Sequence, residues 1–210
     1  MYAPSAFHVT DHKVLYELIS AHPLAMLVRN GDLGPVIAHI PLAATVKNGK
    51  ITSLSGHVAK ANPFWNSAAD KMVVAAFAGP NAYVSPAYYP SKIEHGKVVP
   101  TWNYIRVEAR GQLRLQGDPA QMRGFIDAPT DHMEQSRDHP WSTADAPDPY
   151  IDRLSNAIVG IEIEIAEIQG VWKLSQNKSP TDFAGVLDGL ENDGQGAMAN
   201  AMTSLPGQKE

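Results

Sequence analysis

Four short stretches of the sequence combine polar and aromatic residues, and each interrupts an otherwise apolar strand pattern. Local sequence rules tend to break at functional sites, so these stretches are the candidates for binding or catalysis. The first is His39-Ile40-Pro41, where a proline inside a strand removes a backbone donor. Such a proline indicates an edge, a bulge or a strand that leaves the sheet. A barrel corner is the favoured interpretation, and a binding role for His39 is the alternative.

The second stretch, residues 55–63, runs from a strand through Gly56 towards the expected start of a helix. A turn of this kind presents backbone N–H groups, the Ser55 hydroxyl and the Lys60 ammonium to one point. That combination suits an anion such as a phosphate. Most turns between a strand and a helix bind nothing, however, and a single lysine is more often a solvated surface charge.

The third stretch is Pro100-Thr101-Trp102-Asn103-Tyr104, at the start of a predicted strand. Adjacent side chains on a strand point to opposite faces, so a flat ligand would meet Trp102 or Asn103 but hardly both without a bulge. The commoner role for such a tryptophan is a core or interface aromatic.

The fourth stretch, residues 172–178, groups polar side chains between a strand and a capped helix. Its pattern alone is typical of a loop. Lys173 and Gln176 are alternatively placed to reach a ligand, because a conjugated polar ring system needs a few fixed donors within an apolar pocket.

Familiar catalytic signatures are missing from the sequence. It contains no GxGxxG, GxxxxGK[ST], HExxH or GxSxG motif, and it has no cysteine. Glu162 and Glu164 share one face of a predicted strand, which indicates solvated carboxylates rather than an acid and base pair. The eight histidines are dispersed, so no metal site is predicted.

Composition limits the class of protein and its partners. The 210 residues fit one domain, with 44% hydrophobic and 19% charged residues as in ordinary globular proteins. The net charge of −5 is the wrong sign for general attraction to nucleic acid, and direct DNA binding is therefore doubtful. No stretch approaches the roughly 20 apolar residues that span a bilayer. A cytoplasmic protein without a membrane partner is predicted.

The elements that would position the four stretches are mostly antiparallel strands. Apolar patterns and turn signals predict strands over residues 24–29, 35–44, 51–56, 72–78, 83–85, 101–115 and 161–174, with turns at 30–32, 48–49 and 79–81. Capping signals predict helices after Thr10-Asp11, at Asn62-Pro63, at Asp118-Pro119 and from Ser179, and residues 127–149 are expected to form surface helix ends and loop. About seven strands with helices at the edges predict a closed or nearly closed barrel.

In these stretches and between them, the sequence resembles the PaiB family, described as FMN-binding negative transcriptional regulators and related to pyridoxamine-phosphate-oxidase-type split barrels. Six groups resemble family hallmarks in the same order: Met1-Tyr2-Ala3-Pro4, His39-Ile40-Pro41-Leu42, Gly56-His57 with Asn62-Pro63, Tyr83-Val84-Ser85, Pro100-Thr101-Trp102-Asn103-Tyr104 and Lys173-Leu174-Ser175-Gln176-Asn177. The resemblance runs nearly end to end, and the last two groups are the most specific.

The resemblance implies a mainly β fold with peripheral helices, an antiparallel six-stranded split β-barrel over residues 1–190. The glycines and the proline after Glu191 predict a flexible tail over 191–210. The resemblance also implies a homodimer with two FMN sites at the interface, built by both subunits. The implied cofactor-binding residues are His39, Ser55, Gly56, His57, Lys60, Asn62, Trp102, Asn103, Lys173 and Gln176. Ser55, His57, Lys60 and Asn62 would serve the ribityl-phosphate end, and Trp102, Asn103, Lys173 and Gln176 would lie near the ring or the partner subunit. The phosphate-binding arginine common in related barrels is not identified, although Arg106 and Arg110 are considered.

Two functions remain open at this point. By resemblance, the protein is a flavin-dependent regulator or sensor that acts through protein partners or metabolites, since no helix-turn-helix pattern is present. The alternative is a flavin-dependent oxidoreductase that uses NAD(P)H on a small-molecule acceptor, with the cofactor carrying the chemistry. A third possibility is a split barrel that has lost the flavin and kept the dimer.

Overall fold

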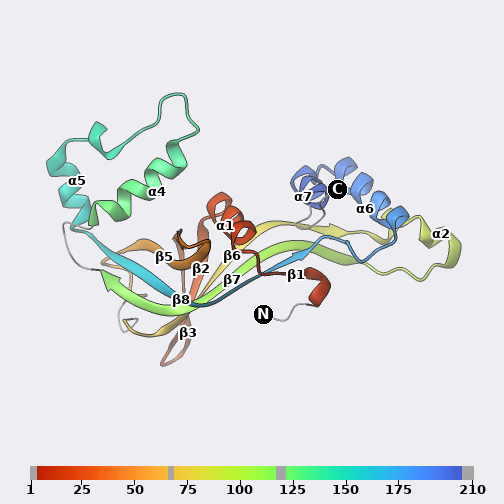
Figure 1. The fold of residues 1–210 in the computed structure, drawn as a ribbon, viewed down its shortest axis with the longest axis horizontal. Coiled ribbons are helices and arrows are strands. Elements are labelled where there is room, and N and C mark those ends of the chain that lie inside the picture. The colour runs from red at the N-terminus through yellow and green to blue at the C-terminus, as the bar shows by residue number, and fades with distance from the viewer. Residues whose placement is uncertain (1–3, 66–68, 117–121, 205–210) are drawn as a thin grey trace. The chain divides into compact units, whose positions relative to one another are not determined.

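An antiparallel sheet is the framework of the computed structural model, which describes residues 4–65, 69–116 and 122–204 (Figure 1). The strands of these residues are β1 (His8–Val9), β2 (Leu24–Gly31), β3 (Gly34–Pro41), β4 (Ala43–Lys47), β5 (Lys50–Ala59), β6 (Met72–Val84), β7 (Thr101–Gln116) and β8 (Ile158–Lys173). The helices are α1 (His12–Ala21), α2 (Ser91–His95), α4 (Gly124–Glu134), α5 (Asp148–Ser155), α6 (Pro180–Asn192) and α7 (Gly196–Thr203). The predicted mainly β class is confirmed, with eight strands in place of the six implied.

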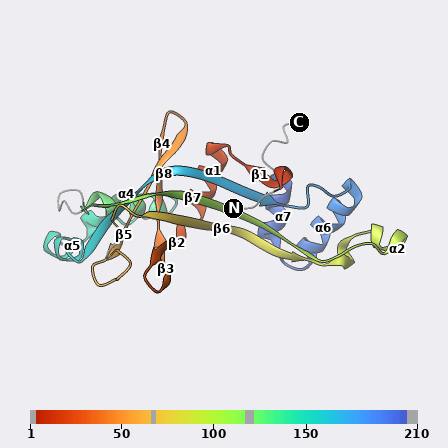
Figure 2. The ribbon, with the colours of Figure 1, turned by 90° about the horizontal axis from the view of Figure 1, so that it is seen from below.

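The sheet closes on itself because its two end strands are consecutive in sequence. The strand order is β3-β2-β6-β7-β8-β5-β4, with β1 paired to β8, and β7 lies between β6 and β8 (Figure 2). Only Leu42 separates the end of β3 from the start of β4. One residue spans at most about 3.5 Å, so the two ends of the sheet must meet. The sheet therefore curls into a barrel, and Pro41 stands at the predicted corner.

Local signals explain why most predicted elements form. Asn48 and Gly49 both have positive φ, 51° and 74°, as a two-residue hairpin turn between β4 and β5 requires. The Asp11 carboxylate accepts the Lys13 backbone N–H at 2.8 Å and caps α1. The Ser179 hydroxyl caps α6 in the same way, accepting the backbone N–H of Asp182. These observations confirm the predicted Asn48-Gly49 turn and the two predicted helix starts, whereas the single strand predicted over residues 35–44 is divided at Leu42 into β3 and β4.

The short helix predicted at Asn62-Pro63 is wrong, because the residues from Asn62 to Trp65 form a turn. The Asn62 Oδ1 does accept a hydrogen bond from the Phe64 backbone N–H, at 2.9 Å. The buried Arg29 side chain donates to the Phe64 carbonyl at 2.7 Å and the Pro63 carbonyl at 3.4 Å. A side chain thus binds the carbonyls that a helix would bond to its own N–H groups.

The turn predicted at residues 79–81 is also wrong, because β6 runs without a break through Pro80 to Val84. β2 pairs with β6 only from Val73 to Ala76. Beyond Ala76 no described residue of β2 pairs with β6, so Pro80 removes no hydrogen bond to β2. The helix start predicted at Asp118-Pro119 lies outside the described residues.

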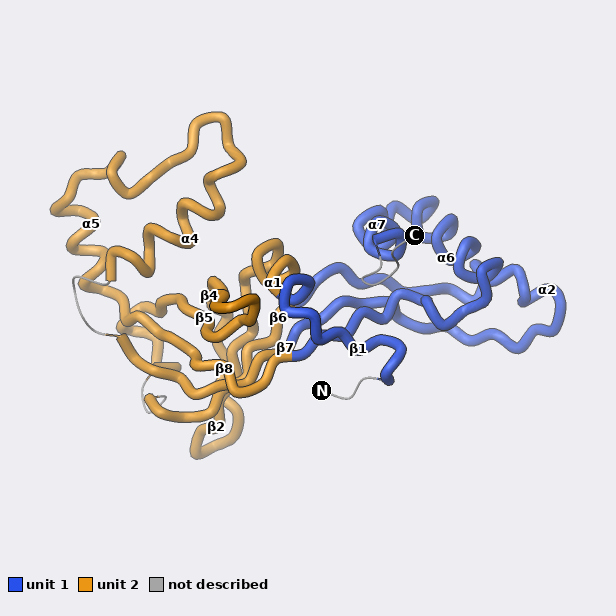
Figure 3. Tube along the Cα trace, viewed as in Figure 1, with its two compact units in different colours: residues 1–15, 78–107, 169–210 blue, residues 16–77, 108–168 orange. Residues whose placement is uncertain are grey.

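The chain divides into two compact units, shown in two colours in Figure 3. The barrel unit contains residues 16–77 and 108–168, and the second unit contains 1–15, 78–107 and 169–210. Residues 191–210 are predicted to fray, but α6 continues to Asn192 and α7 buries Met198 and Met202. That apolar burial is the physical reason for the difference, and residues 205–210, like Met1-Tyr2, lie outside the described residues.

Replacing Leu42 by alanine should destabilise the barrel strongly, because this side chain is 1% exposed at the point of closure. A buried Leu→Ala change costs about 2–5 kcal/mol, and urea unfolding of L42A should show a loss of that size. Leu33 is fully exposed in the β2–β3 turn, so L33A should change stability by less than about 0.5 kcal/mol. Equal effects of the two substitutions would contradict this role for Leu42.

Candidate functional site

Six of the ten predicted binding residues lie in the barrel unit. Ser55, Gly56 and His57 are on β5, and Lys60 and Asn62 are in the turn that follows it. His39 is exposed on β3, opposite Met26 of β2. The end of β5 and its turn therefore form the main predicted cluster.

Two members of this cluster have clear packing roles. A Cβ atom on Gly56 would lie 2.5 Å from the Pro41 carbonyl oxygen, so only glycine fits where β5 meets the barrel corner. The His57 Nδ1 lies 3.2 Å from the Phe125 carbonyl oxygen and donates a hydrogen bond to it. His57 thereby joins β5 to the first turn of α4.

The turn after β5 holds the Lys60 backbone from two sides. The Lys60 N–H donates to the Ala157 carbonyl at 2.8 Å. The Lys60 carbonyl accepts the Trp65 indole N–H at 2.9 Å. The main chain is thus anchored, while the Lys60 residue as a whole is exposed.

Lys60 lines a cavity of about 310 Å³ in the barrel unit, together with Gln116, Met122, Arg123, Asp152, Ser155, Asn156, Ile158 and Val159. Arg123 donates to the Asp148 carboxylate, and this hydrogen bond raises the pKa of the guanidinium. The Arg123 Nε and the Ser155 hydroxyl are buried without a hydrogen-bond partner in the described chain. The cavity thus combines the cationic groups of Lys60 and Arg123 and the carboxylate of Asp152 with two unused polar atoms.

Arg123 is a candidate that the sequence analysis missed. It follows residues whose pattern indicated only a helix start, and nothing in its spacing linked it to Lys60. The arginines that were considered have other partners: Arg106 donates to the Gly79 carbonyl at 3.1 Å, and Arg110 pairs with Glu108 at 2.7 Å.

The other four predicted residues, Trp102, Asn103, Lys173 and Gln176, lie in the second unit, where the fold brings the third and fourth stretches together. Lys173 donates to the Thr101 hydroxyl, and the Ser175 hydroxyl donates to Asn103 Oδ1 at 3.0 Å. Asn103 is fully buried, and its Nδ2 lies 3.6 Å from the Met202 sulfur of α7. Asn103 therefore ties β7 to the end of β8 and to α7.

Gln176 is engaged in the turn that ends β8. Its Oε1 accepts the Leu174 N–H at 2.7 Å, and its Nε2 donates to the carbonyls of Trp172 and Ala6 at 2.6 and 3.1 Å. Trp102, by contrast, is 54% exposed. Its ring meets the Tyr83 ring edge-on, with the two ring centroids 6.0 Å apart. Of the four residues, Trp102 is the one most available to a ligand.

Trp102 and Tyr83 line a second cavity, of about 480 Å³, with Asn81, Ala82, Tyr88, Asp193 and Gln195. The Tyr88 hydroxyl donates to the Asp193 carboxylate, which raises the pKa of the phenol. Three aromatic side chains in one cavity wall suit contact with a flat ring.

Comparison with known proteins decides the family. Residues 1–167 match the model of the family described as "Putative FMN-binding domain". The chain belongs to this family. It is also 28% identical over 194 residues to the protease synthase and sporulation protein PAI 2 of Bacillus subtilis, covering 92% of this chain and 90% of that protein. The predicted PaiB resemblance is thereby confirmed.

An uncharacterized protein of Emericella nidulans is 36% identical over 136 residues, which cover 60% of this chain and 54% of that protein. The chain spans about half the length of this relative and of a second fungal relative, from Aspergillus fumigatus.

Solved structures share the fold. The FAD and heme binding protein from Mycobacterium smegmatis has a TM-score of 0.60 at 17% identity, covering 84% of this chain and 78% of that one. The flavocytochrome Anf3 from Azotobacter vinelandii has a TM-score of 0.57 at 14% identity, covering 87% and 78%. None of the described helices has the length and apolar character needed to cross a bilayer.

The titration of Lys173 should report its surroundings in the second unit. Burial, and then the charge of Lys178, lower the pKa of the Lys173 ammonium below its ordinary 10.5. Between the lowered pKa and 10.5 the unfolded chain binds more protons at this group, so its contribution to stability rises with pH in that interval. We expect Lys178→Gln to raise the Lys173 pKa, as followed by ¹³Cε NMR. Lys47→Gln, in the barrel unit, should leave it unchanged, and an unaltered pKa in K178Q would contradict the assignment.

Proposed function

We propose that the protein binds FMN as a homodimer and acts as a flavin-dependent regulator or sensor. One observation carries this proposal: residues 1–167 match a family that is described as an FMN-binding domain. The barrel geometry supports it, since the predicted phosphate-end residues gather at the end of β5 beside a cavity with two cations.

The 310 Å³ cavity fits the phosphate end of the cofactor. Its volume is near the lower limit of about 300 Å³ for ligand pockets, which leaves room for the phosphate and ribityl chain rather than the whole flavin. Arg123 Nε and the Ser155 hydroxyl are buried polar atoms that a phosphate oxygen would satisfy. The Arg123–Asp148 pair is solvent-exposed, with side chains 42% and 78% accessible, so exchanging Asp148 for phosphate costs little.

The ring end fits the exposed aromatic side chains of the second unit. Tyr83 and Trp102 are 47% and 54% exposed, and large exposed aromatics are typical of the residues that protein interfaces bury. The family resemblance implies sites built by both subunits, and on that basis we assign the phosphate end of each site to one subunit and the ring end to its partner. When bound, the flavin supplies hydride or electron transfer, and this chain supplies binding and orientation.

A regulatory role through metabolites or protein partners agrees with the charge of the molecule. Seventeen basic residues against 22 acidic ones do not favour duplex DNA, whose affinity depends on cationic contacts. Specific duplex binding at physiological salt by the purified protein would overturn this part. Rapid bleaching of bound flavin by NADH or NADPH, with turnover on an added acceptor, would favour an oxidoreductase instead.

FMN binding should depend on Lys60 and Arg123, whereas riboflavin binding should not, since riboflavin lacks the phosphate. Wild-type protein incubated with FMN and desalted should retain the oxidised flavin absorption bands. Hydrogen bonds to charged groups contribute about 1.5–3 kcal/mol, so Lys60→Gln and Arg123→Gln should each weaken FMN affinity about ten- to a hundredfold. The controls Lys47→Gln and Arg137→Gln should bind FMN normally. Colourless wild-type protein without measurable FMN affinity would remove the proposed function.

Mixed dimers should show whether one site draws on two subunits. Lys60→Gln and Trp102→Ala homodimers should both bind FMN poorly. A mixed dimer of the two variants has one site with both substitutions and one site with neither. We therefore expect mixing and re-equilibration to restore one wild-type site per mixed dimer, measured by flavin fluorescence titration. Without restoration, both ends of the site would belong to the same subunit.

A further inference from the structure

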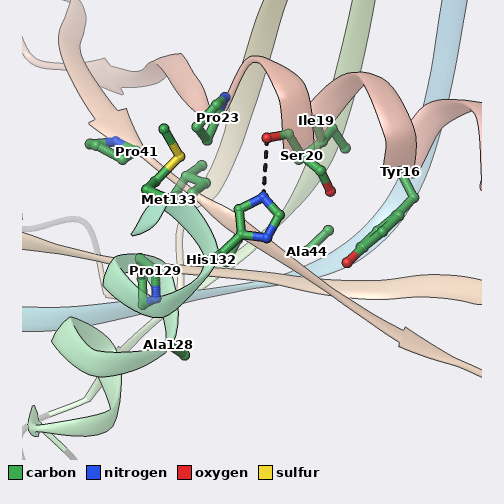
Figure 4. A pocket seen from close by; sticks show the side chains of 12 residues that line it. Tyr16, Ile19, Ser20, Pro23, Pro41, Ala44, Ala128, Pro129, His132 and Met133 are labelled. Carbon is green, nitrogen blue, oxygen red and sulfur yellow. Dashed lines mark hydrogen bonds between the residues drawn. The ribbon is translucent and has the colours of Figure 1, made fainter. Parts of the chain in front are cut away.

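A third cavity, in the barrel unit, is lined by none of the ten predicted cofactor residues. Its volume is about 200 Å³, and it is lined by Tyr16, Ile19, Ser20, Pro23, Pro41, Leu42, Ala43, Ala44, Ala128, Pro129, His132 and Met133 (Figure 4). Three elements build its walls: α1, the corner from β3 into β4, and α4. This apolar cavity is therefore formed by the same corner that closes the barrel.

The His132 side chain crosses one wall of the apolar cavity. The His132 Nε2 lies 3.3 Å from the Ser20 carbonyl oxygen and donates to it, as the dashed line in Figure 4 marks. The Gln135 Nε2 lies 3.3 Å from His132 Nδ1, which accepts from the amide. Both ring nitrogens are engaged, so His132 joins α4 to α1, and the hydroxyls of Tyr16 and Ser20 are the other polar side-chain groups of the lining.

Size and polarity define what the apolar cavity can hold. An apolar cavity of about 150 Å³ holds a benzene molecule, and pockets for drug-sized ligands begin at about 300 Å³. The 200 Å³ here lies between these limits. Its lining contains no Asp, Glu, Lys or Arg side chain, so a charged ligand would be buried without a partner charge.

We propose that this cavity is a binding site for a small neutral organic molecule, a single aromatic ring or a short aliphatic chain that carries one hydroxyl or carbonyl group. The ring or chain contacts the proline, alanine and leucine walls, and the polar group bonds to the Tyr16 hydroxyl. Figure 4 shows the Tyr16 side chain extending towards the side of the cavity occupied by Ala44 and His132. The site is separate from the proposed cofactor cavities, because it shares no lining residue with them.

The test uses 4-fluorophenol and fluorobenzene as probes, followed by ¹⁹F NMR titration of the full chain. Both probes should show saturable binding to the wild type. Ala128→Phe, on α4, and Ala44→Leu, on β4, fill the cavity from opposite sides and should each weaken both probes at least tenfold. Ala184→Phe places the same new ring on an exposed position of α6 and should leave both affinities unchanged.

Tyr16→Phe separates the polar contact from the apolar one. A neutral hydrogen bond contributes about 0.5–1.5 kcal/mol, so this variant should bind 4-fluorophenol about two- to tenfold more weakly and fluorobenzene as well as the wild type does. Absence of saturable binding of either probe to the wild type would overturn the proposal directly. So would binding that A128F and A44L leave intact, since the probes would then lie elsewhere.

Discussion

Contact between β5 and the residues that join β3 to β4 is the constraint on which the barrel depends. The two ends of the sheet are linked by Leu42 alone, and the Pro41 carbonyl comes so close to Gly56 that no Cβ atom fits there. This approach brings the end of β5 to the corner and determines where the following turn begins. Lys60 and the 310 Å³ cavity therefore depend on a packing contact several residues away.

A buried arginine extends this constraint into the turn. Arg29 is 9% exposed, bonds the carbonyls of Pro63 and Phe64, and lies 5.4 Å from the centre of the Phe64 ring. Hydrogen bonds from a guanidinium are strong within a poorly solvated interior, and the cation–π contact adds to them. The turn consequently has a defined shape without a helix. That shape presents Lys60 to solvent with its main chain held on both sides.

In the second unit, a buried polar residue holds the strand that carries an exposed aromatic side chain. Asn103 is buried and bonded to Ser175, while its neighbour Trp102 projects outward because adjacent strand residues face opposite sides. The polar residue that looked like a ligand in the sequence thus secures the strand that carries the aromatic one. A satisfied buried amide of this kind orders its surroundings, because leaving it unpaired would be costly.

The sequence by itself determined the strand periods, the turn at Asn48-Gly49, the hairpin turn near residues 30–32, the caps at Asp11 and Ser179, and the family, because each of these depends on neighbouring residues or on ordered motifs. The prediction from sequence failed at Asn62-Pro63, where the side chain of the distant Arg29 donates hydrogen bonds to the carbonyls that a helix would bond internally. It failed at Pro80, where only the limited pairing of β2 with β6 decides whether the strand can continue. Arg123 beside Lys60, and His132 bonded to Ser20, were decided by tertiary structure alone. In each case the decisive partner is far away along the chain, and no local pattern encodes the contact.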